Sequence, residues 1–305
     1  MLLSGSANGI TMAGPTGGRA MQVPAHFEYQ RATSVEHAIA LLTRHGPETR
    51  VVAGGHSLIP MMKLRLAQPE MLIDINDLGE LAGITVAPGV LRLGAMVRHA
   101  DLLGSAQVGA LLPVLHDAER VIADPVVRNR GTIGGSVCQA DPSEDLAGAF
   151  CALRAVAVIR GADGDRAVPM REFFTGPYET VVGPAEVLVE LRVPLWSAGS
   201  AYLKVDRRSG DWAVAAAAAA VATGPGGVVT EVGIGLTAVG RFLAEEAEDF
   251  LRGRAATEAN LVEAGRVAAQ HCRPTADQRG PVDYKRHLAG ELTTRALRLA
   301  VERAA

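Results

Sequence analysis

The sequence is poor in cysteine, and this scarcity excludes several kinds of site. Its 305 residues include three cysteines, Cys138, Cys151 and Cys272, which are widely spaced and form no CxxC pair. A disulfide framework is therefore not expected, and three thiols cannot supply the four ligands of a zinc or iron–sulfur site. Such usage is typical of a reducing compartment, so we expect a cytoplasmic protein; a loose association with the inner membrane face stays open.

Aromatic residues and basic charge are also scarce. Aromatic side chains make up 4% of the chain, and 30 basic against 33 acidic residues give a net charge of −3. A nucleic-acid partner is not expected, because such proteins carry a basic surplus and aromatic stacking platforms. The longest apolar run, at 213–222, is far shorter than the roughly 20 residues of a membrane-spanning helix, so no integral membrane segment is expected.

Residues 1–20 lack hydrophobic periodicity and are rich in glycine and serine. We expect a disordered extension here, with Met21 at the start of the folded part. The segment has neither a basic start nor a long apolar stretch, so it does not look like a signal peptide. The rest of the chain is long and apolar enough for two or three domains with a real core.

The segment 33–46 has helix signals at both ends. Thr33 or Ser34 can cap it, Glu36 is placed to complete a capping box, and Gly46 is a typical stop. A helix is therefore predicted over this range.

A strand, a glycine turn, a helical segment and a second strand follow, which predicts a small α/β unit. Further on, Pro88-Gly89 predicts the turn of a hairpin, and the chain from about residue 241 has the periodicity of helices. The predicted ranges are 50–55, 56–66 and 70–77 for the α/β unit, 83–97 for the hairpin, 146–161 for a helix running into a strand, and 186–194 for a further strand.

The alanine-rich run at 213–222 admits two interpretations. Alanine has the highest intrinsic helix propensity. The run is followed, however, by glycine and proline at 224–227 and then by a valine-rich segment, which is the pattern of a β-hairpin. We predict sheet.

Two glycine-rich loops give the strongest functional signal. AGGHS at 53–57 follows a predicted strand, and TIGGS at 132–136 follows a helical segment. Successive glycine amides near a helix N-terminus form a concave anion site, so two such loops predict binding of the two phosphates of one dinucleotide. Asp145, after the second loop, is suited to accept hydrogen bonds from ribose or ribityl hydroxyls.

Better-known phosphate motifs are absent. Neither loop has the GxGxxG pattern, and GxxxxGK[ST] does not occur, so neither a Rossmann fingerprint nor a P-loop is supported. The alternative that both loops are tight turns without a ligand stays open at this point, since glycine pairs are common in turns.

The residues around the loops resemble a known family. AGGHSLIPMMKLRLAQPEMLIDI together with IADPVVRNRGTIGGSVCQADPSEDL closely resembles the FAD-binding medium subunit of molybdenum hydroxylases, which include carbon monoxide dehydrogenase and xanthine dehydrogenase. The resemblance runs from about Met21 to the C-terminus and includes AYLKVDRRSGDWA (201–213) and GPVDYKRHLAGELTTRAL (280–297).

The resemblance implies an α+β fold. Its FAD-binding domain, at 21–197, would be of the p-cresol methylhydroxylase type, with two α/β subdomains at about 21–77 and 78–197. A C-terminal domain at 198–305 would hold a three-stranded antiparallel sheet and helices.

The resemblance also implies a set of FAD-binding residues and no catalytic side chain. Ser136 departs from the family, which usually has asparagine there, but a serine hydroxyl can still donate. Tyr202 would be an aromatic residue near the isoalloxazine, and Lys204 a lysine near the flavin. The implied cofactor-binding residues are Ala53, Gly54, Gly55, His56 and Ser57 in a first pyrophosphate loop, Thr132, Ile133, Gly134, Gly135 and Ser136 in a second, and Asp145, Tyr202 and Lys204.

The function implied is that of an oxidoreductase subunit that carries one non-covalent FAD and transfers electrons. Substrate would be oxidised at molybdopterin on a large subunit, and electrons would reach this chain from the [2Fe-2S] clusters of a small subunit. They would then pass to quinone, NAD or oxygen. The family suggests a dimer of heterotrimers, and the histidines here lack metal-ligand spacing. The substrate is not determined by this chain.

Two other functions remain as alternatives. A stand-alone flavin oxidase would act directly on a small molecule in a pocket over the flavin, with or without a covalent bond from His56 to the flavin, but no acid/base cluster is visible near the loops. A scaffold subunit that has lost FAD is disfavoured by the intact loops and Asp145. Asp141 and Glu144 are as well suited to cap the helix that follows as to contact the ligand, and both interpretations stay open. Cys138 is either a reactive thiol or a small buried apolar residue.

Overall fold

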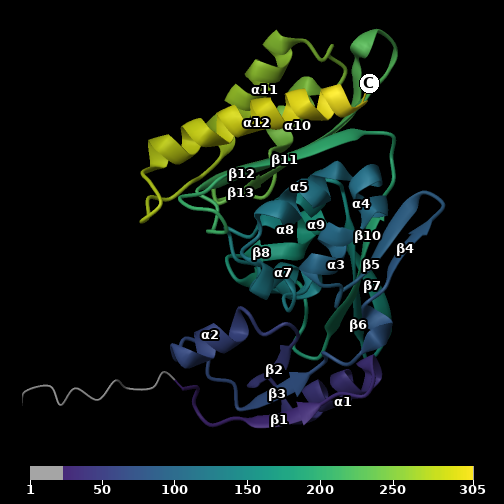
Figure 1. The fold of residues 1–305 in the computed structure, drawn as a ribbon, viewed down its shortest axis with the longest axis vertical. Coiled ribbons are helices and arrows are strands. Elements are labelled where there is room, and N and C mark those ends of the chain that lie inside the picture. The colour runs from purple at the N-terminus through teal and green to yellow at the C-terminus, as the bar shows by residue number, and fades with distance from the viewer. Residues whose placement is uncertain (1–22, 305) are drawn as a thin grey trace, which may run out of the picture.

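The computed structural model describes residues 23–304 and confirms a mixed fold of helices and strands (Figure 1). The predicted extension 1–20 and Met21 lie outside the described residues. Three larger sheets follow one another along the chain, with the N-terminal unit at one end of the molecule and the C-terminal helices at the other.

The N-terminal unit is a parallel sheet in the order β1-β3-β2. Met71 of the central strand lies opposite Glu28 on one side and Thr49 on the other. The sequence pattern does not reveal β1, because its residues EYQR are mostly exposed and show no apolar alternation. The elements are β1 (Glu28–Arg31), α1 (Val35–His45), β2 (Thr49–Val52), α2 (Leu58–Lys63), β3 (Met71–Asp74) and a 3-10 helix (Gly79–Leu81).

The ends of α1 confirm two predicted signals and correct a third. Ser34 caps the helix by accepting a hydrogen bond from the His37 amide (3.1 Å), and Gly46 ends it with a φ of +77°. The predicted capping box is wrong, because Glu36 sits one position too early for this cap. Its carboxylate forms an ion pair with Arg160 instead (3.1 Å).

The middle part is an antiparallel sheet in the order β4-β5-β10-β6-β7. The hairpin predicted at Pro88-Gly89 joins β4 to β5, and the predicted helix-to-strand segment is α8 followed by β6. Val158, Val187 and Val189 of this sheet share a buried cluster with α1, which fixes the N-terminal unit against the middle part. The strands are β4 (Ile84–Ala87), β5 (Val90–Gly94), β6 (Val156–Gly161), β7 (Gly164–Pro169) and β10 (Val187–Pro194), with β8 (Phe174–Gly176) and β9 (Glu179–Thr180) as a separate pair.

Short helices cover the middle sheet and carry most of the chain between β5 and β6. They pack on a second buried cluster that also includes the inner face of the C-terminal sheet. The helices are α3 (His99–Gly104), α4 (Ala106–Leu111), α5 (Pro113–Val121), α6 (Pro125–Arg128), α7 (Ile133–Gln139), α8 (Asp145–Ala152) and α9 (Met170–Phe173).

The C-terminal part is a three-stranded antiparallel sheet, β11-β12-β13, as the family resemblance implies. The long helix α12 lies across its outer face in Figure 1, and α5 and α8 pack on its inner face. Within residues 23–304, no helix combines the length and apolarity that a bilayer crossing requires. The elements are β11 (Gly199–Val205), β12 (Ala215–Thr223), a 3-10 turn (Pro225–Gly227), β13 (Val229–Thr237), α10 (Glu245–Leu251), α11 (Glu258–His271) and α12 (Val282–Ala304).

The alanine-rich run is strand β12, which confirms the choice of sheet over helix. Alternate alanines of this strand face the cluster of the middle part and the cluster beneath α12, so both faces are buried. The helices approach closely: a Cβ at Gly235 would overlap the Gly148 carbonyl of α8, and a Cβ at Gly199 would overlap the Ala300 carbonyl of α12. This close packing on both faces requires small side chains and outweighs alanine's intrinsic preference for helix.

Candidate functional site

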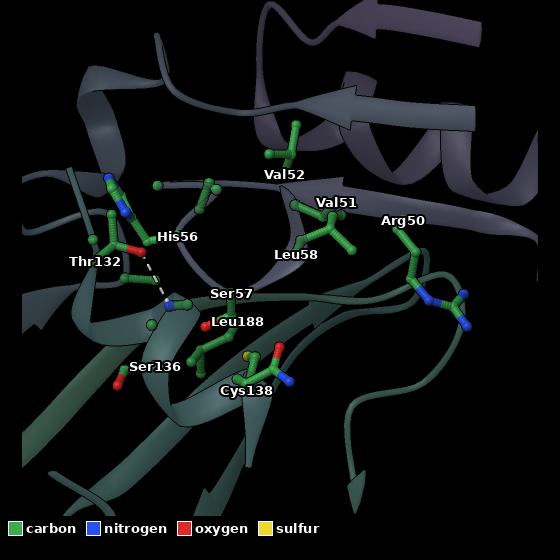
Figure 2. Close-up of a pocket in the computed structure, with 18 of the residues that line it drawn as sticks. Arg50, Val51, Val52, His56, Ser57, Leu58, Thr132, Ser136, Cys138 and Leu188 are labelled. Atoms are coloured by element: carbon green, nitrogen blue, oxygen red, sulfur yellow. Dashed lines mark hydrogen bonds between the residues drawn. The ribbon is translucent and has the colours of Figure 1, made fainter. Parts of the chain in front are cut away.

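Both glycine loops line one cavity of about 850 Å³ between the N-terminal unit and the middle part. Figure 2 shows side chains from β2, from the first loop and from α7 around it. The volume lies within the roughly 300–1,000 Å³ typical of cofactor sites. Of the predicted site residues, those lining the cavity are Ala53, Gly54, Gly55, His56, Ser57, Thr132, Gly134, Gly135, Ser136 and Asp145, whereas Ile133, Tyr202 and Lys204 lie behind this lining.

The first loop, residues 53–57, connects β2 to α2 and offers unused backbone donors. The amides of residues 54–57 have no hydrogen-bond partner within the described part of the chain. Gly55 has a φ of +78°, a conformation that favours glycine and turns the chain toward α2. His56 is exposed at the cavity, and Ser57 begins α2 without a capping hydrogen bond from its side chain. The loop therefore has the free donors that the sequence predicts for an anion cradle.

In the second loop the corresponding amides are already used. All four amides of residues 133–136 have acceptors within the protein. Gly134 donates to the Ala95 carbonyl (2.9 Å), and Gly135 donates to the hydroxyl oxygen of Thr132, which caps α7 (3.1 Å; dashed in Figure 2). The prediction of free amides is therefore wrong for this loop, because these residues form the first turn of α7 and are bonded to the middle part.

The glycines also differ in what their missing side chains avoid. A Cβ at Gly54 would overlap the Arg130 carbonyl, so the first loop touches the second at this point. A Cβ at Gly134 would lie 2.6 Å from the Cβ of Ala95, inside the protein. Gly135 is exposed at the cavity. All three glycines line the cavity, but Gly135 is the most exposed of them, and a Cβ there would lie 2.7 Å from the Thr132 hydroxyl.

Glu144 lies directly behind the second loop. It caps α8 by accepting hydrogen bonds from two amides (2.8 and 2.7 Å), which confirms the capping interpretation. The Ser136 hydroxyl donates a hydrogen bond to the same carboxylate (2.7 Å), and contact between Ser136 and a cofactor stays a prediction. Burial raises the pKa of Glu144 to about 7, although the hydrogen bond from Ser136 opposes this.

Asp145 forms one wall of the cavity together with two residues behind it. Its carboxylate accepts hydrogen bonds from the Tyr202 hydroxyl (2.6 Å) and the Lys204 ammonium (2.8 Å). Burial, with this carboxylate beside it, holds the pKa of Tyr202 well above its usual range, so its hydroxyl remains a donor. The three predicted residues are thus brought together, but Tyr202 and Lys204 support Asp145 from within, and contact between either of them and a flavin stays a prediction.

Two aromatic side chains of the described residues line the cavity, Tyr178 and, nearer the C-terminal sheet, Trp212. Trp212 is 43% exposed, whereas Tyr202 is 3% exposed. Trp212 follows a turn in which Arg207 donates to Asp211 (3.1 Å), the pairing that its sequence spacing suggests. Trp212 lies in the segment 201–213 that carries the family resemblance. The resemblance pointed to Tyr202 in that segment, and Trp212 was not predicted.

Sequence reasoning also missed a buried pair, His99 and Glu119. The His99 Nδ1 lies 3.0 Å from a carboxylate oxygen of Glu119, and both residues are buried. Burial opposes protonation of His99, but Glu119 raises its pKa above the usual value. A Cβ at Gly131 would lie 2.9 Å from the imidazole, so His99 supports the second loop from beneath. No sequence pattern links these two residues, which are 20 positions apart.

Two further candidates from the sequence are Cys138, whose role stays undetermined, and Asp141, whose contacts are structural. Cys138 is exposed at the cavity rather than buried, while Cys151 and Cys272 are buried. Asp141 accepts a hydrogen bond from the Ser143 amide (2.9 Å) and does not cap α8. Among residues 23–304, no group of three or more histidine, cysteine, aspartate or glutamate residues could hold a metal ion.

The chain matches two family models in succession. Residues 25–196 match the FAD binding domain in molybdopterin dehydrogenase, and residues 200–300 match the CO dehydrogenase flavoprotein C-terminal domain. Together the two matches span nearly all of the described residues.

Individual relatives agree with these matches. The carbon monoxide dehydrogenase medium chain of Hydrogenophaga pseudoflava is 43% identical over 93% of this chain and 100% of its own length. The glyceraldehyde dehydrogenase medium chain of Sulfolobus acidocaldarius is 34% identical over 90% of this chain and 98% of its own. A solved structure of the H. pseudoflava carbon monoxide dehydrogenase lacking the Mo-pyranopterin moiety aligns with a TM-score of 0.90 at 44% identity, over 93% of this chain and 100% of that one.

Proposed function

Because the chain belongs to the family of FAD-binding subunits of molybdopterin dehydrogenases, we propose that it binds one FAD non-covalently in the cavity between the glycine loops and serves as an electron-transfer subunit. The observation that carries this proposal is the row of free amides at 54–57, which faces the cavity without any acceptor in the described part of the chain. Such a row needs an anion or water to satisfy it.

The residues present fit this cofactor. The amides of 54–57 would hold the pyrophosphate, and Gly135 is exposed on the opposite side of the cavity. Asp145 retains free lone pairs on the cavity side and would accept from hydroxyls of the ribityl or ribose group. Trp212 offers an aromatic face for a flat ring system.

The lining of the cavity extends from the N-terminal unit to the neighbourhood of the C-terminal sheet, as an extended dinucleotide requires. Arg50 and Val187 lie among the lining residues near the N-terminal unit, whereas Ile122 and Trp212 line it near the C-terminal sheet. Bound FAD supplies the redox chemistry, and the protein positions it and excludes water. No side chain of this chain is assigned as a catalytic acid or base.

The proposed assembly follows from the relatives, which are medium chains of larger enzymes. We propose a large molybdopterin-binding partner, a small partner with [2Fe-2S] clusters, and a dimer of such heterotrimers located in the cytoplasm. Electrons would enter from the clusters and leave to quinone, NAD or oxygen. The substrate belongs to the large subunit, and the relatives' names include both carbon monoxide and glyceraldehyde dehydrogenases.

The test is a visible absorption spectrum of the purified chain before and after acid precipitation. Flavin bands that move entirely to the supernatant are expected, since the proposed FAD is not covalently bound. Flavin that stays in the pellet would instead indicate a covalent bond, with His56 as the exposed candidate, and would favour the oxidase alternative. A purified chain that neither contains FAD nor binds added FAD would contradict the proposal.

A further inference from the structure

A short chain of side-chain hydrogen bonds joins the backbones of the two glycine loops. The Asn76 amide nitrogen donates to the Ala53 carbonyl in the first loop (2.6 Å). The Arg98 guanidinium donates to the Asn76 amide oxygen (2.9 Å) and also to the Arg130 carbonyl, just before the second loop. Two side chains therefore connect loops that are more than 70 residues apart in the sequence.

Both side chains are anchored at their own ends. Asp74 accepts hydrogen bonds from the Asn76 backbone amide and from its side-chain amide, both at 2.7 Å, so the orientation of Asn76 is fixed. The backbone beside Arg98 is bonded to the second loop, because the His99 amide donates to the Gly131 carbonyl (3.2 Å). Neither anchor depends on a ligand.

The position of this link suggests an indirect effect on the cavity. Asn76 and Arg98 are half-buried and stand outside the set of described residues that line the cavity. They act where Gly54 packs against the Arg130 carbonyl, so closely that a Cβ at Gly54 would overlap it. Hydrogen bonds across this contact set the distance between the two loops. They do not themselves contact a ligand in the cavity.

We propose that Asn76 and Arg98 are positioning residues that hold the free amides of 54–57 at the correct distance from the wall formed by α7. This inference rests on the proposed FAD function, since that distance matters for a pyrophosphate held between the loops. Arginine suits the task because its planar guanidinium donates to two acceptors at once. The link also crosses from the N-terminal unit to the middle part, so it couples two separately folded sheets.

Two nearly isosteric or charge-conserving variants test the link. Asn76→Asp keeps an acceptor for Arg98 but loses the donor to the Ala53 carbonyl and to Asp74, against which it places a second carboxylate. Arg98→Lys keeps the charge but loses the planar guanidinium that donates to two acceptors at once. Each should raise the dissociation constant of FAD, titrated into the apo chain, by about tenfold or more. The double variant should lose about as much as one single variant, since either change breaks the same link. Arg31→Ala is the control, because Arg31 pairs with Asp77 at the nearby surface and should leave FAD affinity unchanged.

Amide hydrogen exchange of the apo chain gives a second readout that does not depend on FAD. The amides of 133–136 are hydrogen-bonded and should exchange slowly. Asn76→Asp directly alters the contacts with Ala53, Asp74 and Arg98, none of which lies in 133–136, yet it should speed exchange at 133–136 if the link couples the loops. Unchanged exchange there, or losses of FAD affinity that multiply in the double variant, would overturn the inference. A wild-type chain without FAD affinity would overturn the proposed function, while the exchange result would still decide the coupling.

Discussion

The two glycine loops have similar sequences but opposite states of their backbone donors. In AGGHS the amides of 54–57 have no partner in the described part of the chain, whereas in TIGGS the amides of 133–136 are all bonded within the protein. The first loop is therefore a row of open donors, and the second is the closed first turn of α7. A phosphate held between them would take its backbone hydrogen bonds mainly from the first loop.

The comparison shows that the glycines of such a motif are required for different structural reasons. Gly55 is required by its positive φ, Gly54 by contact with the other loop, and Gly134 by contact with Ala95. Only Gly135 is exposed on the side of the cavity. Substitutions at these positions should separate effects on folding from effects on cofactor binding.

The largest effect is expected for Gly134→Val. Its Cβ would lie 2.6 Å from both the Cβ and the carbonyl oxygen of Ala95, in a region with no room to adjust. The apo chain should lose about 3 kcal/mol or more of its free energy of unfolding, or fail to fold, as overpacked cores do. Urea denaturation of the flavin-free protein measures this. Flavin binding should be lost together with the fold, because the new side chain clashes with Ala95 inside the protein and not with a phosphate oxygen in the cavity.

Gly135→Ala is the matched control for this substitution. Its methyl group would point toward the Thr132 hydroxyl (2.7 Å) beside the cavity, and alanine is the better helix former at this position in α7. We expect a change in unfolding free energy within about 1 kcal/mol, with a clear loss of FAD affinity. Equal destabilisation by both variants would remove the distinction between a packed and a ligand-facing glycine.

The acid behind the second loop should give that loop a pH dependence that the first lacks. Burial raises the pKa of Glu144 from 4.5 to about 7, so the folded chain holds this proton more tightly than the unfolded chain. Its contribution to stability is therefore full below about pH 4.5 and is lost as pH rises through 7. Relative to Glu144→Gln, which cannot ionise, the wild type should lose at most about 3 kcal/mol across this window.

The measurement is the difference in unfolding free energy between wild type and Glu144→Gln from pH 5 to 7.5, without FAD. Glutamine loses one capping acceptor, which adds an offset that does not vary with pH. A difference that stays flat over the whole range would show that Glu144 is ionised in the folded chain.

Much of the fold could be predicted because its signals are local. Ser34 and Gly46 set the ends of α1, and Pro88-Gly89 set a hairpin, each through the conformational preference of one or two residues. The prediction of sheet for β12 was also correct: the glycine-rich turn after it signals a hairpin, and the close packing on both faces outweighs alanine's helix propensity. Strand β1 could not be predicted, since its pairing with β3 is a tertiary contact that leaves no apolar alternation. The domain boundaries at 77 and 197 stay predictions.

The two loops of the site were predicted from the sequence, but the residues that hydrogen-bond to the loops and hold them in place were not. Spacing and composition indicated 53–57 and 132–136, both of which line the cavity. That all four amides of the second loop are bonded could not be predicted from the sequence, because two of their acceptors, the Ala95 and Val97 carbonyls, come from a distant segment. The same holds for the link through Asn76 and Arg98, whose two residue types are common in solvent-exposed positions.

A moderate effect is expected for Gly55→Ala in the first loop. Its φ of +78° costs an alanine about 1–2 kcal/mol, and the new methyl group would press on Ile59 (3.3 Å). Gly89→Ala is the matched control, because Gly89 has a φ of +75° and open space around it. Both variants should lose similar unfolding free energy, but only Gly55→Ala should also weaken FAD binding by redirecting the free amides. Equal FAD affinities in the two variants would argue against an anion cradle in the first loop.

The smallest effects should come from the two hydroxyl residues that begin the helices after each loop. Thr132 caps α7 through its side chain, so Thr132→Ala should cost the apo chain about 1 kcal/mol. Ser57 occupies the same position before α2 but makes no capping bond, so Ser57→Ala should leave the stability of the apo chain unchanged and lower only the affinity for FAD. Thermal unfolding with and without FAD compares the two. A destabilised apo Ser57→Ala would mean that this loop is closed on itself as the second one is, and that the free amides are not reserved for a ligand.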